Sequence, residues 1–342
     1  MHNNERIYVD VHVLQTVPPS CVNRDDTGSP KTAVYGGVTR ARVSSQAWKH
    51  AMRQAFVEES LLDEEDVGKR TKKVTELVEK EIAALAPEKD AAKLAKKTLD
   101  NAGIKNDEKG TKALFFISQA QIKALAQLAV EECADKKEYK KALSTAPSAD
   151  IALFGRMVAD DPSLNFDAAA QVAHSISTHA VQNEYDYFTA VDDCQVEDNA
   201  GAGHLGTVEY NSATLYRYAT VNVMELERHL DAEKAAEVVR SFGEAFIRSM
   251  PTGKQNTFAN RTLPDAVYVT IREDQPVNLC GAFERAVRLR RALQERVAGL
   301  CTAAVSELCG DPCKELYRGH RAGSTGPGPA AEHHAGCTGR SC

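Results

Sequence analysis

A short stretch of the chain, residues 24–53, concentrates side chains that bind phosphate. Six of its residues are basic, and only Asp25 and Asp26 oppose them. The basic residues are Arg24, Lys31, Arg40, Arg42, Lys49 and Arg53. Arginine suits bidentate contact with phosphate oxygens, and lysine supplies a compact charge. The pattern predicts a local polyanion site on a chain whose formal net charge is −6.

The same stretch contains backbone features that suit an anion. Ser44, Ser45 and Gln46 open a predicted helix, where free N–H groups and the helix dipole favour negative charge. Gly36 and Gly37 lack a Cβ, so another backbone approaches them closely. A basic segment is often only a solvated surface, but cations, a helix start and a glycine pair together favour binding of a phosphate-bearing polyanion.

Two adjacent aspartates, Asp192 and Asp193, offer a different chemistry. Paired carboxylates bind metal ions that cut RNA. No third ligand clusters with them, and such a pair also suits a turn or a salt bridge. We therefore predict no catalytic residue and no metal site, and we keep a metal-dependent ribonuclease as the alternative function.

The composition places the chain in an ordinary soluble class. Its 342 residues include nine cysteines, an odd number that favours reduced thiols over a disulfide framework. No stretch is long and apolar enough for a membrane helix, and the first residues lack a signal-peptide pattern. We expect a cytoplasmic protein with no membrane partner.

The carboxyl-terminal residues gather several possible zinc ligands. They are Cys309, Cys313, His320, His333, His334, Cys337 and Cys342. A Gly/Pro-rich run at 323–329 interrupts them and contributes no core residues. The sequence therefore predicts a flexible tail over 309–342, without a metal or another cofactor.

The elements that must position the basic stretch follow from periodicity. Alternating apolar residues predict strands over 7–14, 215–223 and 266–271. Helical patterns are predicted over 46–59, 168–180, 231–250 and 282–305. Pro, Gly and Asp residues predict a long loop over 18–42. Residues 61–145, rich in Ala, Lys, Glu and Leu, are typical of a helical insertion. Without it, the order strand, helix, strand, helix, strand predicts an α+β core of the RRM-like, ferredoxin-like kind.

Several ordered blocks of the sequence together carry a family resemblance. They are Val11–Asp26, Ala33–Gly37, Arg40–Lys49, Asp150–Met157, Phe188–Asp193, His204–Thr207 and Tyr216–Ala219. These blocks resemble the CasC family, the backbone subunits of type I-E CRISPR Cascade complexes. They spread over residues 7–272, so a chance match is improbable. The tail beyond Cys309 departs from the family.

The resemblance implies a hand-shaped subunit. A modified RRM-like palm would cover residues 1–60 and 146–308, a helical finger 61–145, and a thumb hairpin 184–212. Such subunits polymerise along a CRISPR guide RNA and present it to target DNA. The implied partners are further copies of the chain, the large and small Cascade subunits, the subunits that cap and process the guide, and a recruited helicase–nuclease. Backbone subunits of this type are scaffolds, so no enzymatic activity is expected.

The resemblance also assigns roles to residues outside the basic stretch. Met157 matches a position beside the guide where bases are disrupted, although methionine is usually a core residue. Tyr187, Phe188 and Thr189 match the thumb, whose side chains wedge at a displaced nucleotide. Lys254, after the helix break at 251–253, joins the candidate RNA-binding residues. Incubating the protein with guide RNA and Mg²⁺ separates the two functions, because only a ribonuclease shortens the RNA.

Overall fold

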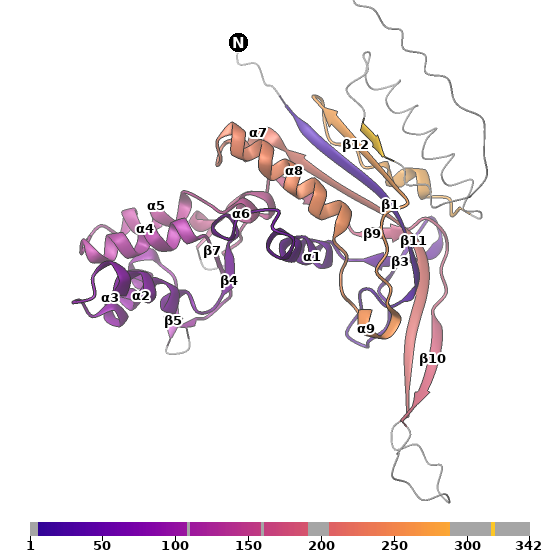
Figure 1. Cartoon of the computed structure of the whole chain (residues 1–342), viewed down its shortest axis with the longest axis horizontal. Coiled ribbons are helices and arrows are strands. Elements are labelled where there is room, and N and C mark those ends of the chain that lie inside the picture. Colours follow the sequence, from indigo (N-terminus) through magenta and orange to yellow (C-terminus); the bar gives the residue numbers. More distant parts are fainter. Residues whose placement is uncertain (1–5, 108–109, 159–160, 191–204, 288–315, 319–342) are drawn as a thin grey trace, which may run out of the picture.

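The computed structural model of the protein describes residues 6–107, 110–158, 161–190, 205–287 and 316–318. Figure 1 shows an antiparallel sheet with two long helices on one face, a helical lobe beside it, and a projecting hairpin. We call the sheet and its helices the palm, the lobe the finger, and the hairpin the thumb. A mixed fold of helices and an antiparallel sheet is thus confirmed.

The palm sheet is built around a long central strand, β1. The strands follow the order β13-β12-β1-β11-β9-β3-β2, and β8 and β10 also pair with β11. Their bounds are β1 Tyr8–Ser20, β2 Thr32–Tyr35, β3 Val38–Val43, β8 Ala170–Val172, β9 Ser175–Ser177, β10 Glu184–Thr189, β11 Leu205–Asn222, β12 Ala266–Arg272 and β13 Leu316–Arg318. Val11 of β1 lies opposite Ala219 of β11 and Val269 of β12. The three strands predicted from alternation are confirmed, but β1 continues past its predicted end to Ser20, and β11 begins before its predicted start, at Leu205.

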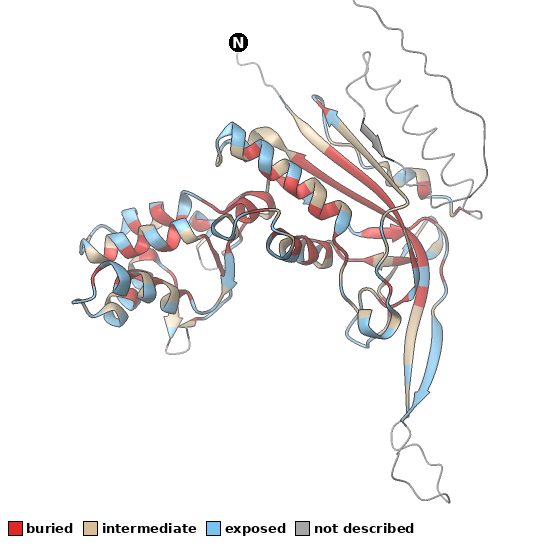
Figure 2. Ribbon diagram, in the orientation of Figure 1, coloured by how far each residue is buried: buried red, intermediate tan, exposed pale blue. Residues whose placement is uncertain are grey.

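Helices α1 (Ser45–Glu58) and α8 (Ala232–Arg248) cover one face of the sheet. Trp48, Met52 and Phe56 of α1 meet Phe242 and Phe246 of α8 in the main core, red in Figure 2. Both helices begin at the predicted cap, since the side chains of Ser44 and Asp231 accept backbone N–H groups. The remaining palm helices are short: α6 Ala149–Phe154, α7 Val223–Glu227, α9 Gln255–Phe258 and the 3-10 helix η3 Leu279–Phe283.

The helix predicted over 168–180 is wrong, because this segment forms β8 and β9. Local alanines favour a helix, but tertiary partners decide the outcome. Ser175 accepts the indole N–H of Trp48 at 2.9 Å, and Ser177 accepts the Ala41 N–H at 3.0 Å. Both serines are fully buried.

The loop predicted over 18–42 is also wrong in part. β1 extends to Ser20, and β2 and β3 form a hairpin in which Tyr35 lies opposite Val38. Gly36 and Gly37 form its two-residue turn with φ of 60° and 77°, where residues with a Cβ are strained. A Cβ on Gly36 would lie 1.6 Å from the Glu284 carbonyl oxygen. The close approach that Gly36 allows is therefore to the protein's own backbone.

The finger has a core of its own. Its elements are η1 Glu64–Asp66, β4 Lys69–Thr71, α2 Val74–Leu85, α3 Ala91–Ala102, β5 Asn106–Asp107, β6 Gly110–Thr111, β7 Phe115–Ile117, α4 Gln119–Val130 and α5 Lys136–Ser144, followed after α6 by η2 Pro162–Leu164. Ile82, Leu99 and Leu125 are buried together inside it. β4 pairs with β7 at the junction with the palm.

The carboxyl-terminal elements can be compared with their predictions only in part. The helix predicted over 282–305 lies largely outside the described residues, which show η3 and continue to Val287. Within the predicted tail, Leu316–Arg318 form β13 at the edge of the sheet.

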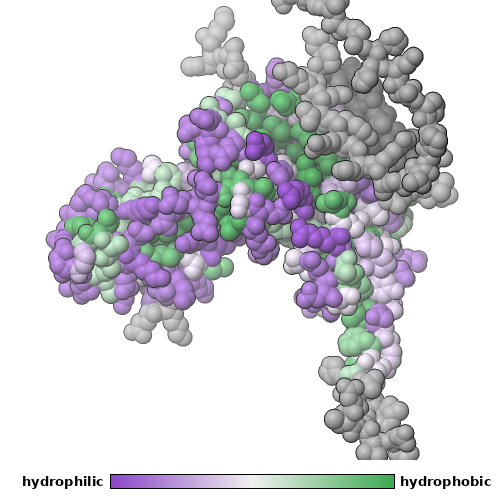
Figure 3. Space-filling view, viewed as in Figure 1, coloured by the Kyte–Doolittle hydropathy of each residue, from purple (hydrophilic) through white to green (hydrophobic). Residues whose placement is uncertain are grey.

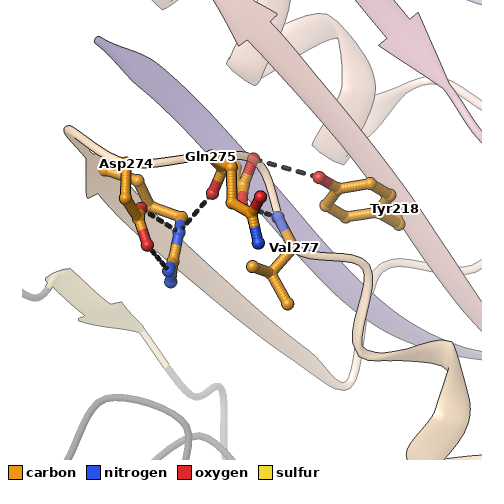
Figure 4. Close-up of polar contacts among 6 residues, drawn as sticks. Tyr218, Asp274, Gln275 and Val277 are labelled. Carbon is orange, nitrogen blue, oxygen red and sulfur yellow. Dashed lines mark hydrogen bonds and ion pairs between the residues drawn. The ribbon is translucent and has the colours of Figure 1, made fainter. Parts of the chain in front are cut away.

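A segment after β12 packs on the sheet face that α1 and α8 leave open. In Figure 4, Tyr218 and the Val277 N–H both approach the buried carboxylate of Asp10, at 3.1 and 2.9 Å. Arg272 pairs with Asp274 and donates to the Gln275 carbonyl, which shapes the turn. The segment thereby encloses a polar network.

His12 lies inside this network, as a strand residue rather than a surface base. Its Nδ1 lies 2.9 Å from the Tyr216 hydroxyl, and its ring stacks on Tyr218. Burial, assisted by the charge of Arg272, lowers the pKa of His12 to about 3 from 6.5. The folded protein therefore holds a neutral imidazole at neutral pH.

We expect this histidine to make the protein acid-sensitive. Between pH 6.5 and about 3 the unfolded chain binds a proton at His12 that the folded chain does not. Stability should fall as pH drops, by about 2 kcal/mol between pH 6.5 and 5. Urea unfolding across this range measures the slope. His12→Phe keeps a stacked ring and should reduce the dependence of stability on pH. His50→Ala, which removes an exposed histidine, should leave that dependence unchanged. Equal slopes in all three proteins would contradict the assignment.

Candidate nucleic-acid interface

The outward face of α1 forms the floor of a groove. A hollow of about 530 Å³ lies between this face, the loop 22–28 and the turn 251–253. A second hollow, of about 570 Å³, lies between α1 and residues 64–69 of the finger. His50 and Gln54 line both hollows, which therefore adjoin across the helix. The sequence prediction missed Gln54, although the i, i+4 row from Gln46 through His50 leads to it.

One end of the groove gathers Arg24 and Lys254 from distant parts of the chain. Arg24 is exposed on a loop shaped by Asp25, whose carboxylate accepts the N–H groups of Thr27 and Ser29. A Cβ on Gly253 would lie 2.1 Å from the Val22 carbonyl oxygen, so the turn bearing Lys254 packs tightly on this loop. The structure thus brings together two residues predicted separately.

Lys31 and Arg42 form a second cationic pair beside β3. The Arg42 guanidinium donates to the Thr32 carbonyl and lies 3.3 Å from Nδ1 of His174. Burial, then Arg42 and Lys31, lowers the pKa of His174. The two cations therefore lie close enough to the imidazole to oppose its protonation.

Arg40 and Ser44, two predicted RNA contacts, instead serve the protein's own structure. Arg40 is fully buried and donates to the carbonyls of Tyr35, Ser177, Phe283 and Glu284. Ser44 is buried, and its hydroxyl caps α1. Ser45 and Gln46 remain at the surface beside the cap. A Cβ on Gly37 would meet no atom within 4 Å, so its turn conformation alone requires glycine.

Lys49 and Arg53 lie on the flank of α1 that faces the finger. The Lys49 ammonium lies 5.6 Å from the Phe154 ring centroid. Arg53 donates to Asp150 at 2.8 Å and to the Gly68 carbonyl at 2.9 Å. Arg53 therefore joins the palm to the finger as well as bearing charge.

Met157 is the most exposed of the large apolar side chains in the described ranges, at 86%. It follows α6, whose end is turned by Gly155 at φ 75°. The adjacent Arg156 is buried against the finger. The ordinary alternative, that Met157 packs in the core, is thus wrong.

The thumb presents its aromatic residues on two different faces. Every residue of β10 is exposed. Tyr187 and Thr189 alternate with Phe188, so they face the opposite side of the strand. Phe188 lies across from Gly206, and its ring occupies the space where a Cβ on Gly206 would stand. Figure 3 shows apolar side chains along this hairpin.

The residues of the two metal-based alternatives lie outside the described part of the chain. They are Asp192 and Asp193, and the cysteines and histidines from Cys309 onward. Among the residues that are described, no three His, Cys, Asp or Glu side chains are grouped to hold a metal ion. Within the same ranges, no helix has the length and apolar character needed to cross a bilayer.

Comparison with known proteins gives a consistent result. A family model described as "CT1975-like protein" matches residues 9–312. A chain of a solved "CRISPR RNA-guided surveillance complex, pre-nicking" is 33% identical, with a TM-score of 0.74 and 90% of each chain covered. A chain of another "CRISPR RNA-guided surveillance complex" is 30% identical, with a TM-score of 0.58 and coverage of 91% and 87%. No curated protein matches the chain.

Proposed function

Because the chain belongs to the CT1975-like family, we propose that it is a backbone subunit of a type I-E Cascade complex. In this role it binds guide RNA, oligomerises along it and presents it to target DNA. The observation that carries the proposal is that Arg24, Lys49 and Lys254 lie on or beside α1 although they come from separate segments. Lys31 lies nearby, because its N–H donates to the carbonyl of Asn23, whose side chain accepts the N–H of Ser44 at the start of α1. A local group of cations on a chain whose formal net charge is −6 is suited to binding a polyanion at that place.

The proposed ligand contact is through phosphates, because a guide must be held whatever its sequence. Lysine and arginine heads reach phosphate oxygens and leave base edges free for pairing. The exposed Met157 and the thumb aromatics suit contact with base faces. The order β12-β1-β11, with α1 and α8 on one face, supports an RRM-like palm.

The proposed assembly makes the protein a scaffold rather than a catalyst. The thumb extends away from the palm and exposes aromatic residues that the described part of the chain leaves uncovered. A second copy on the same guide would cover them. The other Cascade subunits and the helicase–nuclease would join through this filament, and the protein would act in the cytoplasm.

A binding titration tests the RNA assignment. Lys49→Ala with Lys254→Ala should weaken binding equally for guides of unrelated sequence. It should also reduce the magnitude of the log–log salt slope by about 1.4, because each phosphate contact on a single strand accounts for about 0.7 of that slope. Arg240→Ala, an exposed cation of α8 outside both hollows, is the control.

Unchanged affinity and slope in the double variant would remove the groove from the RNA path. The same mixtures with Mg²⁺ test the ribonuclease alternative, because a scaffold leaves the RNA at full length.

A further inference from the structure

A cluster of three cations lies where the finger meets the palm. Arg70 of β4 lies directly opposite Phe116 of β7. The guanidinium carbons of Arg70 and Arg53 lie 4.9 and 4.5 Å from the centroid of that phenyl ring. Lys49 lies one helical turn before Arg53 on α1, so the three cations come from two parts of the molecule.

Only one carboxylate compensates these charges among the described contacts. Asp150 is fully buried and accepts Arg53 at 2.8 Å, the Gly68 N–H at 2.8 Å and the Ser148 hydroxyl at 2.7 Å. Its oxygens are thus committed to these three donors. In the described part of the chain, neither Lys49 nor Arg70 has a hydrogen-bonded or ion-paired partner for its charged group.

The cations also repel one another in their present positions. Burial, then the charge of Arg70, lowers the pKa of Lys49. Burial, then the charge of Arg53, lowers the pKa of Arg70. The charge of Asp150 opposes the lowering at Arg70 without cancelling it, so three cations share one carboxylate and would gain from an added anion.

We propose that Arg70 completes a phosphate site with Lys49 and Arg53, and that a phosphodiester of the guide RNA therefore bridges the palm and the finger. This deepens the proposed function and rests on it. Arg53, fixed by Asp150 and Gly68, sets the spacing, while Lys49 and Arg70 supply charged groups that no described carboxylate contacts directly. Phe116 and Phe154 hold the cations in place by cation–π contact, which lessens the ordering needed on binding.

The site couples RNA binding to the position of the finger. β4 begins next to Gly68, whose N–H and carbonyl are both held by the Asp150–Arg53 pair. A phosphate that contacts Lys49 and Arg70 together adds a second bridge across the same junction. RNA should therefore slow hydrogen exchange of the β4 amides in the wild-type protein.

The experiment compares Arg70→Ala and Arg70→Gln with the matched control Arg240→Ala in the full chain. Single-stranded RNA long enough for one copy is titrated across a series of salt concentrations. Loss of Arg70 should weaken binding about tenfold and reduce the magnitude of the salt slope by about 0.7. RNA should no longer slow exchange of the β4 amides in these variants. Arg70→Gln keeps its aliphatic stem on Phe116, so it provides a folded variant if alanine loosens the junction.

Wild-type affinity and slope in both Arg70 variants would overturn this site while leaving the proposed function in place. Failure of the wild-type protein to bind RNA would overturn both. Weakened binding that is accompanied by an unchanged salt slope would assign Arg70 to packing rather than phosphate contact, and would also overturn the site.

Discussion

Replacing Arg156 by alanine is expected to lower the free energy of unfolding by about 3–5 kcal/mol. Arg156 is buried between the palm and the finger. Its Nε donates to the Leu164 carbonyl at 2.9 Å, and its Nη2 donates to the Leu143 carbonyl at 2.7 Å. Its Nη1 lies 3.1 Å from both the Phe116 carbonyl and Gln121 Oε1. Alanine would remove all four of these hydrogen bonds, although the Leu143 carbonyl and Gln121 Oε1 would each keep one other donor, Gln121 Nε2 and the Ser118 N–H.

Burial disfavours the charged form of this side chain. Burial lowers the pKa of Arg156 to about 10, and no carboxylate contacts it in the described part of the chain. The guanidinium carbon of Arg156 lies 4.9 Å from the ring centroid of Phe115 and 4.8 Å from that of Phe166. Hydrogen bonds in several directions and two aromatic faces therefore offset the desolvation.

Chemical denaturation of the full chain measures the effect. Arg156→Lys should restore little of the lost free energy of unfolding. A single ammonium group cannot reach all the acceptors that are arranged around the planar guanidinium. Lys141→Ala, which removes an exposed finger cation, is the control and should change stability by less than about 1 kcal/mol. A loss of less than about 1 kcal/mol in Arg156→Ala would show that the junction does not depend on this residue.

The sequence could predict elements whose periodicity agrees with their tertiary setting. α1 follows a serine cap and a stripe of Trp48, Met52 and Phe56, so local and global signals coincide. β1 and β12 have alternating apolar residues in the sequence, and both form strands, paired with each other in the sheet. At 168–180 the local and the tertiary signals conflict. The alanine-rich composition favours a helix, but a hydrogen bond from Trp48 and pairing with β11 hold the segment as short strands.

The candidate site was harder to predict, because composition does not reveal which basic side chains are exposed and which are bonded to the protein's own carbonyl groups. Arg24 and Arg40 look alike in sequence, yet one is exposed and the other is enclosed by carbonyl groups. Arg70 belongs to the inserted segment, and only the pairing of β4 with β7 brings it to Phe116 and Arg53. Sequence motifs thus pointed to α1 as the candidate helix, while long-range pairing determines which cations are exposed beside it.

The second large effect should appear in assembly rather than in folding. Tyr185 and Tyr187 are 66% and 63% exposed on one side of β10, and Leu205 lies beside them, also exposed. Each tyrosine that a neighbouring copy covers would bury a large apolar surface, and a buried aromatic anchor contributes about 2 kcal/mol to an interface. Changing both tyrosines to serine should weaken each contact between adjacent copies by about 10³-fold.

The measurement compares RNA that holds one copy with RNA that holds several. Tyr185→Ser with Tyr187→Ser should melt like the wild type, since neither ring is buried in the chain. It should bind the short RNA with nearly wild-type affinity, yet form small complexes on the long RNA by light scattering. Leu85→Ser, which changes an exposed apolar residue of the finger, should assemble normally.

Phe188→Ser should differ from both, because it uncovers Gly206 and loosens the hairpin itself. Full-size complexes from the double tyrosine variant would place the contact between copies elsewhere on the chain.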